Sequence, residues 1–425
     1  MAAGTTITAG KDIQARRGNA PFWCALIAAA VMLRVGIAAI STGTNDARLF
    51  LTFASEIRQF GILGTYGMDG LLNHPPAVVA WIKLAAYLSD EAPHPFGPFQ
   101  AFTFIFKLPI IAADAMGIWI VWKVWRPKLG AHHAAAIAAA AAWSLGGILT
   151  SGYHCNTDPI YAALCLAAVY LMEERKAFFV AGLALGAAIN VKIVPVLLIP
   201  GLLLSCRSPR EARLLLAGLA ACVIPFLPVL ASNAPSFVHN ALAYNSNVNN
   251  WGITLLLLAN RLWHGTIGVT TPAVETYHDL GRYVVFGLIG IWAVLARILN
   301  RWTRYEIAAM TFAIFLIFTP GFGIQYLAMI APLLFAIRPG LAFVYCTAAG
   351  AFAGALYLTH LQPNAFPLQS VLGWFPPRES MLGLIAWIVL MTFLVGTLRR
   401  RRSAVADQSA TGQPLHASYT SARAA

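Results

Sequence analysis

The sequence predicts an all-α protein that crosses a membrane about twelve times, and its composition is the first observation behind this prediction. Of the 425 residues, 59% are hydrophobic and 11% are charged, and the mean hydropathy is +0.69. Soluble globular domains carry about 25% charged residues. The composition therefore excludes a cytosolic enzyme, a disordered scaffold and a disulfide-stapled secreted domain, and it indicates a polytopic membrane protein.

The second observation is a series of apolar stretches that approach the length needed to cross a bilayer. They lie at 21–41, 101–122, 131–151, 156–172, 177–191, 193–206, 214–231, 281–300, 305–319, 324–337, 341–359 and 381–398. One further apolar segment, 75–89, is short and contains Lys83. Whether this segment crosses the membrane decides on which side every later loop lies.

The third observation is the distribution of Lys and Arg, which concentrate in cytoplasmic loops of membrane proteins. If 75–89 does not cross, 20 of the 29 basic residues fall on the cytoplasmic side; if it crosses, every basic cluster after the first falls outside. The sequence thus predicts both termini in the cytoplasm and 75–89 as a helix at the outer interface. The net charge of +13 reflects this topology, so no nucleic-acid partner is expected.

The predicted organisation has three parts. Residues 1–20 form a cytoplasmic segment, residues 21–398 form the transmembrane domain, and residues 399–425 form a basic and then disordered cytoplasmic tail. We interpret the first span as a retained anchor in the plasma membrane and not as a cleaved signal peptide. Two long external segments, at about 42–100 and 232–280, are the expected place of function, because long external loops are usually functional.

Asp46 begins the first external segment. After it, Leu49, Phe50, Phe53, Ile57 and Phe60 recur at helical spacing, which predicts an amphipathic interfacial helix with a carboxylate at its start. Asp is a common N-cap residue, so capping is one interpretation of Asp46. A catalytic carboxylate is the other, and the two roles are compatible.

Two further groups of polar residues are predicted on the external side. His154, Asn156 and Asp158 fall together in the corner after the third span, where His154 and Asp158 are candidate metal ligands and capping is the alternative. Lys192 lies between two apolar runs, and it needs an anionic partner such as a phosphate unless it extends to lipid headgroups.

The second external segment is rich in amides and aromatic residues, the side chains that commonly recognise sugars. The candidates here are Tyr244, Asn250, Trp251 and Arg261. A turn-rich loop is the alternative interpretation, because Asn is common in turns.

Four patterns along the chain resemble the GT-C fold glycosyltransferases, which use polyprenyl-phosphate sugars outside the cytoplasm. Asp46 follows the first span, where that superfamily has its catalytic carboxylate. The HPP of His74 is similar to the HPP or YPP element of protein O-mannosyltransferases and dolichyl-phosphate-glucose glucosyltransferases. YHCNTDP and AINVK resemble the HFQYN and A-x-N-x-K portions of those glucosyltransferases, and GIQYLAMIAPLL resembles the QYLxWxxPLL element of bacterial polyprenyl-phosphate mannosyltransferase-like proteins.

The resemblance covers about residues 20 to 340, and the order of the motifs supports it more than any one motif does. Cys155 stands where an aromatic residue is expected, and Ala328 stands where the QYL element has Trp. Both departures concern the choice of sugar and acceptor more than the fold.

The resemblance implies an integral-membrane hexosyltransferase of the extracytoplasmic face, with mannose or glucose as the sugar and an envelope lipid, glycan or protein as the acceptor. It implies Asp46 as the base and Lys192 as the phosphate partner. The further implied substrate-binding residues are His74, His154, Asn156, Asp158, Arg261, Arg282, Gln325 and Tyr326. The resemblance implies no certain cofactor; a divalent metal at His154 and Asp158 is left open, as is the oligomeric state.

Two other functions stay open from the sequence. A secondary transporter or lipid flippase would use the intramembrane charges Arg34, Lys83, Lys107 and Asp114 for ion coupling. Against it are the lack of a convincing internal repeat and the gathering of polar residues toward one face. The other is a non-catalytic membrane partner protein.

Overall fold

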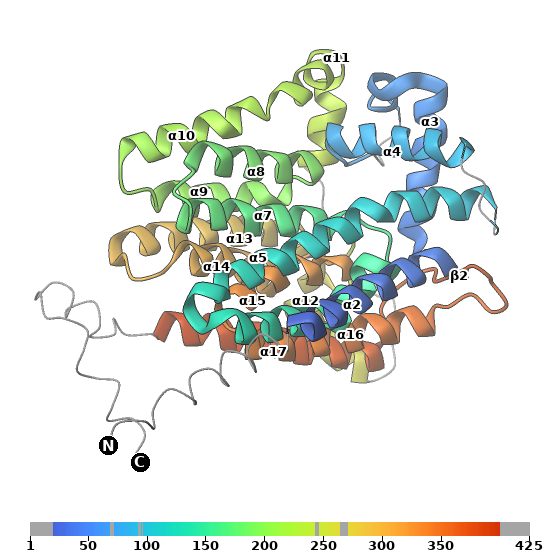
Figure 1. Ribbon diagram of the computed structural model, residues 1–425. Coiled ribbons are helices and arrows are strands. Elements are labelled where there is room, and N and C mark those ends of the chain that lie inside the picture. Colours follow the sequence, from blue (N-terminus) through green and yellow to red (C-terminus); the bar gives the residue numbers. More distant parts are fainter. Residues whose placement is uncertain are drawn as a thin grey trace, which may run out of the picture.

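The structure is a computed structural model that describes residues 20–68, 72–91, 95, 97–242, 246–263 and 271–399. The described chain is a bundle of helices with two very short strands (Figure 1). The first half contains α2 (Ala20–Ile40), β1 (Ser41–Gly43), α3 (Asn45–Thr65), α4 (Pro76–Glu91), α5 (Pro98–Ala142), α6 (Leu145–Ile148), η1 (Leu149–Tyr153), α7 (Asp158–Glu173) and α8 (Phe178–Val191).

The second half continues the bundle with shorter and more interrupted helices. It contains η2 (Val194–Leu197), α9 (Leu198–Leu204), α10 (Pro209–Ala221), η3 (Ile224–Phe226), α11 (Leu227–Phe237), η4 (Val238–Leu242), α12 (Gly252–Trp263), α13 (Pro272–Leu299), α14 (Arg304–Phe318), η5 (Ile324–Ala328), α15 (Ala331–Ile337), α16 (Pro339–Thr359), β2 (Leu368–Gln369) and α17 (Pro377–Arg399). The predicted all-α class is confirmed.

Six helical stretches within the described residues are long and apolar enough to cross a membrane: 21–40, 98–142, 209–241, 272–299, 339–359 and 377–399. Shorter apolar helices occupy 178–191, 194–204 and 324–337. Helix α4, at the segment predicted to lie at the interface, is not among the six. The total of about twelve crossings therefore stays a prediction.

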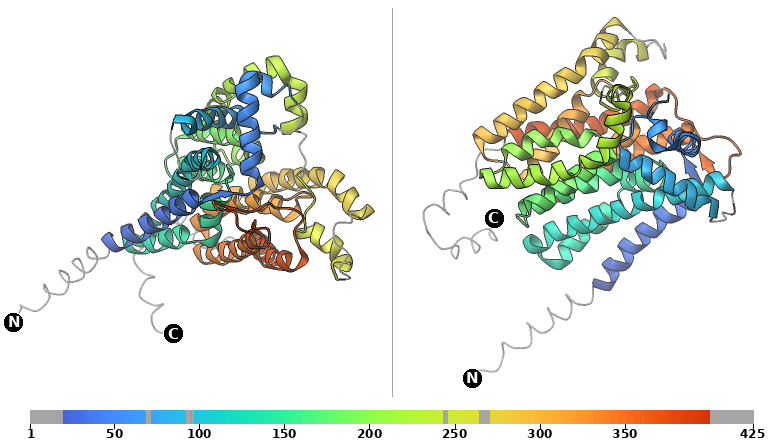
Figure 2. Two further views of the ribbon diagram at one scale, coloured as in Figure 1. Left: turned by 90° about the vertical axis from the view of Figure 1, so that its right-hand side faces the viewer. Right: turned by 90° about the horizontal axis from the view of Figure 1, so that it is seen from above.

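Helix α5 reverses direction at Gly130, which divides it into two antiparallel arms. Gly130 has φ 79° and ψ 169°, a conformation that glycine adopts readily because it has no Cβ. The first arm ends and the second begins at the same end of the bundle as the start of α2. These three helical segments pack against one another (Figure 2).

Helices α3 and α4 and the segment with β2 gather at the other end of the bundle, on the right in Figure 1. Helix α3 turns Phe50, Phe53 and Ile57 inward, as the helical spacing predicted, while Phe60 is exposed. Strand β1 pairs in parallel with β2. Through this pairing, the start of α3 is tied to a segment more than 300 residues later in the sequence.

Three of the four intramembrane charges considered for a transporter, Arg34, Asp114 and Lys107, have local partners. The Arg34 Nε lies 2.7 Å from the Asp114 carboxylate, and Ser151 bonds to both side chains. The Lys107 ammonium donates to the main-chain oxygen of Ser41 at 2.8 Å, while Lys83 is exposed on α4. These hydrogen bonds and this ion pair hold neighbouring segments of the bundle together, and none of them favours ion coupling.

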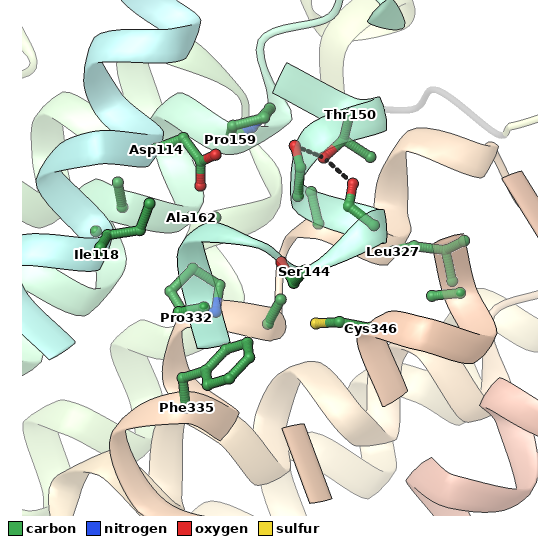
Figure 3. A pocket seen from close by; sticks show the side chains of 18 of the residues that line it. Asp114, Ile118, Ser144, Thr150, Pro159, Ala162, Leu327, Pro332, Phe335 and Cys346 are labelled. Carbon is green, nitrogen blue, oxygen red and sulfur yellow. Dashed lines mark hydrogen bonds between the residues drawn. The ribbon is translucent and has the colours of Figure 1, made fainter. Parts of the chain in front are cut away.

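Asp114 also lines a small internal cavity of about 40 Å³, together with Ser144, Thr150 and Cys346 (Figure 3). Ligand pockets typically enclose about 300–1,000 Å³. This cavity is therefore too small for a sugar or a lipid phosphate.

Candidate functional site

The Asp46 carboxylate lies between His154 and Asn156, in the corner formed by the loop that joins η1 to α7. Its Oδ2 accepts a hydrogen bond of 2.5 Å from the Asn156 side-chain amide and lies 3.3 Å from His154 Nε2. The N-cap of α3 is Thr44, and Asp46 stands in the first turn. Capping is therefore not the role of this side chain. About a quarter of it, 27%, remains accessible to solvent.

Gly43 allows the close approach that brings Asp46 to this corner. It has φ 100°, and a Cβ at this position would collide with the main-chain oxygen of Tyr153. The next residue, Thr44, donates to the main-chain oxygen of His154 from both its main-chain N–H (3.3 Å) and its hydroxyl (3.0 Å). A residue without a side chain is thus required where β1 crosses the corner.

The corner itself has a left-handed residue between the two that contact Asp46. Cys155 has φ 66°, which is uncommon for a residue other than glycine and costs of order 1–3 kcal/mol. With this turn, His154 and Asn156 both reach the Asp46 carboxylate. Cys155, which stands where the resemblance expects an aromatic residue, is therefore the residue at which the chain turns.

Helix α16 packs against the corner through Tyr357, which contacts Tyr153 and His154. The Tyr357 hydroxyl lies 2.7 Å from His154 Nδ1, so both ring nitrogens of His154 have partners. Ser370 bonds to the Tyr153 hydroxyl at 2.7 Å and to the main-chain oxygen of Tyr357. Sequence reasoning missed Tyr357, because nothing in its local sequence connects it with a histidine 203 positions earlier.

Lys192 and Asp158 form a second charged pair in the site. The Lys192 Nζ donates to Asp158 Oδ2 at 2.7 Å, and the Tyr161 hydroxyl donates to Oδ1 at 2.8 Å. Asp158 is fully buried, whereas 15% of the Lys192 side chain is accessible. The Lys192 ammonium also lies 4.9 Å from the centre of the Tyr326 ring. The anionic partner that the sequence required for Lys192 is thus Asp158 within the chain.

The electrostatics of the site favour an ionised Asp46. Burial by itself disfavours the charged carboxylate, but the hydrogen bonds from His154 and Asn156 and the positive charge of Lys192 outweigh it and lower the pKa of Asp46. Burial, together with the charge of Lys192, lowers the pKa of His74 to about 3. His74 is therefore neutral at pH 7, and its ring packs on Phe50 at 5.0 Å.

A cavity of about 530 Å³ lies next to the charged pair. Its wall is mostly aliphatic and aromatic, and its polar lining includes Ser246, Arg282 and the hydroxyl-bearing Tyr326. Its volume falls within the range of about 300–1,000 Å³ typical of ligand pockets. Arg282 lines the cavity, and Lys192 lies beside it, over the ring of Tyr326, which is part of the lining.

His154 and Asp158 do not form a metal site with each other. The nitrogens of His154 bond to Tyr357 and Asp46, and the oxygens of Asp158 bond to Tyr161 and Lys192. Across the described residues, no group of three or more His, Cys, Asp or Glu side chains lies together as metal ligands would. Within the part of the chain that the structure describes, the donor set around His154 and Asp158 does not fit a bound metal ion.

The other predicted site residues have different positions: some are packed elsewhere, one lies beside Tyr326, and some lie outside the described residues. Trp251 stacks on Phe322 at 4.2 Å, and the Asn250 amide donates to the main-chain oxygen of Phe375; both are buried in packing and are not brought to Asp46. Gln325 is half-buried on η5, beside Tyr326. Tyr244 lies outside the described residues, and so does the side chain of Arg261 in α12.

Comparisons with known proteins find one family. The model of glycosyltransferase family 87 matches residues 92–322, which is more than half of the chain. The matched range includes the corner at His154, Lys192 and Arg282, whereas Asp46 and His74 precede it. A search of curated proteins finds no match.

Proposed function

The chain belongs to glycosyltransferase family 87, and from this membership we propose that it transfers a hexose, mannose or glucose, from a polyprenyl-phosphate donor. The acceptor is an envelope lipid, glycan or protein, and the reaction takes place on the extracytoplasmic face of the plasma membrane. The family membership supports a membrane glycosyltransferase. The donor, the acceptor and the side of the membrane belong to the proposal.

The observation that carries the proposal is the Asp46 carboxylate, which is hydrogen-bonded, ionised and partly accessible beside a cationic residue. Transfer from a phosphate leaving group to a hydroxyl needs a base at the hydroxyl. Asp46 is that base. His154 and Asn156 hold its carboxylate in place, and the low pKa of Asp46 keeps it unprotonated and ready to accept a proton at neutral pH.

The departing lipid phosphate needs positive charge close to the bond that breaks. An ammonium group has three N–H donors, and Lys192 directs one of them to Asp158. The others are available to a phosphate oxygen. Arg282, in the lining of the adjacent cavity, supplies a second cation, and the apolar wall of the cavity suits the first isoprene units of the donor.

The reaction balances with these groups. The acceptor hydroxyl gives its proton to Asp46, and its oxygen forms a bond to the anomeric carbon of the hexose. The bond from that carbon to the phosphate oxygen breaks with its electron pair, and polyprenyl phosphate leaves beside Lys192 and Arg282. Attack opposite the leaving group inverts the configuration at the anomeric carbon.

Two buried atoms are suited to recognising sugar hydroxyls. His74 Nδ1 and Asn156 Oδ1 are buried and have no hydrogen-bond partner among the described residues. A buried polar atom without a partner costs about 1–3 kcal/mol, which a substrate hydroxyl would offset. In the proposal, Tyr326, Gln325, Tyr244 and Arg261 complete the walls of the substrate site.

The test is to incubate the purified protein with polyprenyl-phosphate mannose or glucose and extracted envelope lipids, and to follow consumption of the lipid-linked sugar. Wild-type protein should consume at least one of the two donors, and Asp46→Asn should not. Asp90→Asn is the matched control, because Asp90 is a carboxylate on α4 that is more than half exposed and paired with Arg58 away from the site. If Asp46→Asn consumes the donor as fast as Asp90→Asn does, Asp46 is not the base.

A further inference from the structure

A second recess lies at the end of the bundle opposite Asp46, between α2 and the two arms of α5. It encloses about 330 Å³, and its lining includes Trp23, Cys24, Trp119, Trp122, His132 and Ala135. Trp23 is 17 residues before the end of α2, which at about 1.5 Å per residue places it roughly 26 Å along the helix from β1. The recess is therefore separate from the site around Asp46.

The recess is built from three helical segments that meet where α5 reverses. The Trp23 indole N–H donates to His132 Nδ1 at 3.1 Å and joins the start of α2 to the second arm of α5. Trp119 and Trp122 come from the first arm, and Ala135 comes from the second. The lining is mostly apolar, and Trp119 is 53% exposed.

Two cations lie over the tryptophans of the recess. The Lys123 Nζ is 5.1 Å from the Trp119 ring and 5.3 Å from the Trp122 ring, and the Arg126 guanidinium is 5.0 Å from the Trp122 ring. Neither cation is ion-paired with a carboxylate of the described chain. An apolar recess with two such cations at its edge matches a molecule with an apolar tail and an anionic head.

We propose that this recess binds an anionic phospholipid of the membrane, with an acyl chain against Trp119 and Trp122 and the headgroup phosphate beside Lys123 and Arg126. The predicted topology assigns this end of the bundle to the cytoplasmic leaflet, where anionic lipids attract basic residues beside a span. The acyl chain occupies a concave surface between three helices, which distinguishes it from lipid that touches a convex helix face. This binding is independent of the sugar-transfer reaction.

The test uses the full chain in detergent micelles, titrated with phosphatidylglycerol whose acyl chains carry bromine, a short-range quencher of tryptophan fluorescence. Phosphatidylcholine with the same brominated chains is the comparison lipid. Each basic side chain near a membrane surface contributes about 1 kcal/mol toward anionic lipid, so with Lys123 and Arg126 together quenching should require about thirtyfold less phosphatidylglycerol than phosphatidylcholine. Equal quenching by the two lipids would overturn the proposal.

Variants of the charges decide whether the recess is responsible. The double variant Lys123→Gln with Arg126→Gln should lose the preference for phosphatidylglycerol. Arg207→Gln with Arg210→Gln is the matched control, because these two exposed arginines carry the same charge outside the recess, and it should keep the preference. A preference that survives the first double variant, or disappears in the second, contradicts the assignment of the headgroup to Lys123 and Arg126.

Cys24 gives a second, independent measurement on the unmodified chain. It lines the recess and is the one exposed cysteine of the six. Phosphatidylglycerol should slow its alkylation by a maleimide, and phosphatidylcholine at the same concentration should not. Ala135→Phe, which fills the recess, should abolish the difference between the lipids. Alkylation that is indifferent to the lipid headgroup overturns the proposal.

Discussion

The side-chain amide of Asn156 donates a hydrogen bond of 2.5 Å to the Asp46 carboxylate, although the two residues are 110 positions apart in the sequence. This bond is one of the reasons why the pKa of Asp46 is lowered. It also leaves Oδ1 of Asn156 buried and without a partner among the described residues. The same side chain therefore holds the proposed base and presents an acceptor atom next to it.

Asn156→Ala removes one of the interactions that lower the pKa of Asp46, so that pKa should rise. Because the unprotonated carboxylate is the active form, the acidic limb of the profile of kcat/KM against pH should move to higher pH. Measuring kcat/KM between pH 4 and 8 for wild type and variant checks this. A limb that stays in place, with activity merely reduced at every pH, would show that Asn156 acts on the substrate alone.

Asp46→Asn retains the shape of the side chain and removes its ability to accept a proton. General-base catalysis contributes about 10²–10⁴-fold, so kcat should fall by that order with the KM for the donor nearly unchanged. The measurement is steady-state kinetics on protein whose melting temperature matches that of wild type. Turnover within a few-fold of wild type would move the search for the base to other external carboxylates, Asp158 among those described and Asp69 outside the described residues.

Lys192→Met leaves Asp158 as a fully buried charge without its partner. Breaking a buried pair in this way costs about 3–5 kcal/mol, so the single variant should melt at a clearly lower temperature. Adding Asp158→Asn removes the orphan charge and keeps an acceptor for the Tyr161 hydroxyl. The double variant should recover most of the stability.

The same double variant separates stability from donor binding. A charge-assisted hydrogen bond contributes about 1.5–3 kcal/mol, so the KM for the polyprenyl-phosphate donor should rise about tenfold to a hundredfold. Asp158→Asn alone is the control, because it keeps Lys192. If the double variant has the KM of this control, Lys192 is only a structural partner of Asp158.

His74 should make the protein less stable as the pH falls. Burial lowers its pKa from 6.5 to about 3, so between these values the unfolded chain binds a proton that the folded chain does not. Stability is fully present above pH 6.5 and decreases toward pH 3, by at most about 1.4 kcal/mol per pH unit. The melting temperature of His74→Gln should therefore fall less between pH 7 and 5 than that of wild type or of the exposed control His133→Gln. Parallel curves for all three proteins would contradict this.

The topology can be read by cysteine labelling in intact cells. In a Cys24→Ser background, a cysteine at Gln59 on α3 should react with an impermeant maleimide added outside, and one at Arg210 on α10 should not. Both positions are exposed, so accessibility within the protein does not limit either reaction. Labelling at position 210 would mean that the segment 75–89 crosses the membrane.

The sequence by itself determined the class of protein, the helical fold and the family to which the chain belongs. Hydrophobic content, span length and the distribution of Lys and Arg depend on local composition, which is why the helices could be predicted without coordinates. The interfacial position of α4 stays a prediction. The amphipathic face of α3 was predictable for the same reason, since Phe50, Phe53 and Ile57 recur with the period of a helix.

The tertiary structure decided which polar residues work together, because the paired residues lie 34 to 203 positions apart in the sequence. Only the fold joins Asp46 to Asn156 and His154 to Tyr357, gives Lys192 an internal partner in Asp158, and buries Asn250 and Trp251 in packing. The physical reason lies in the close approach at Gly43 and the left-handed turn at Cys155. The close approach and the turn determine where the side chains of Asp46, His154 and Asn156 point. No local pattern in the sequence predicts these directions.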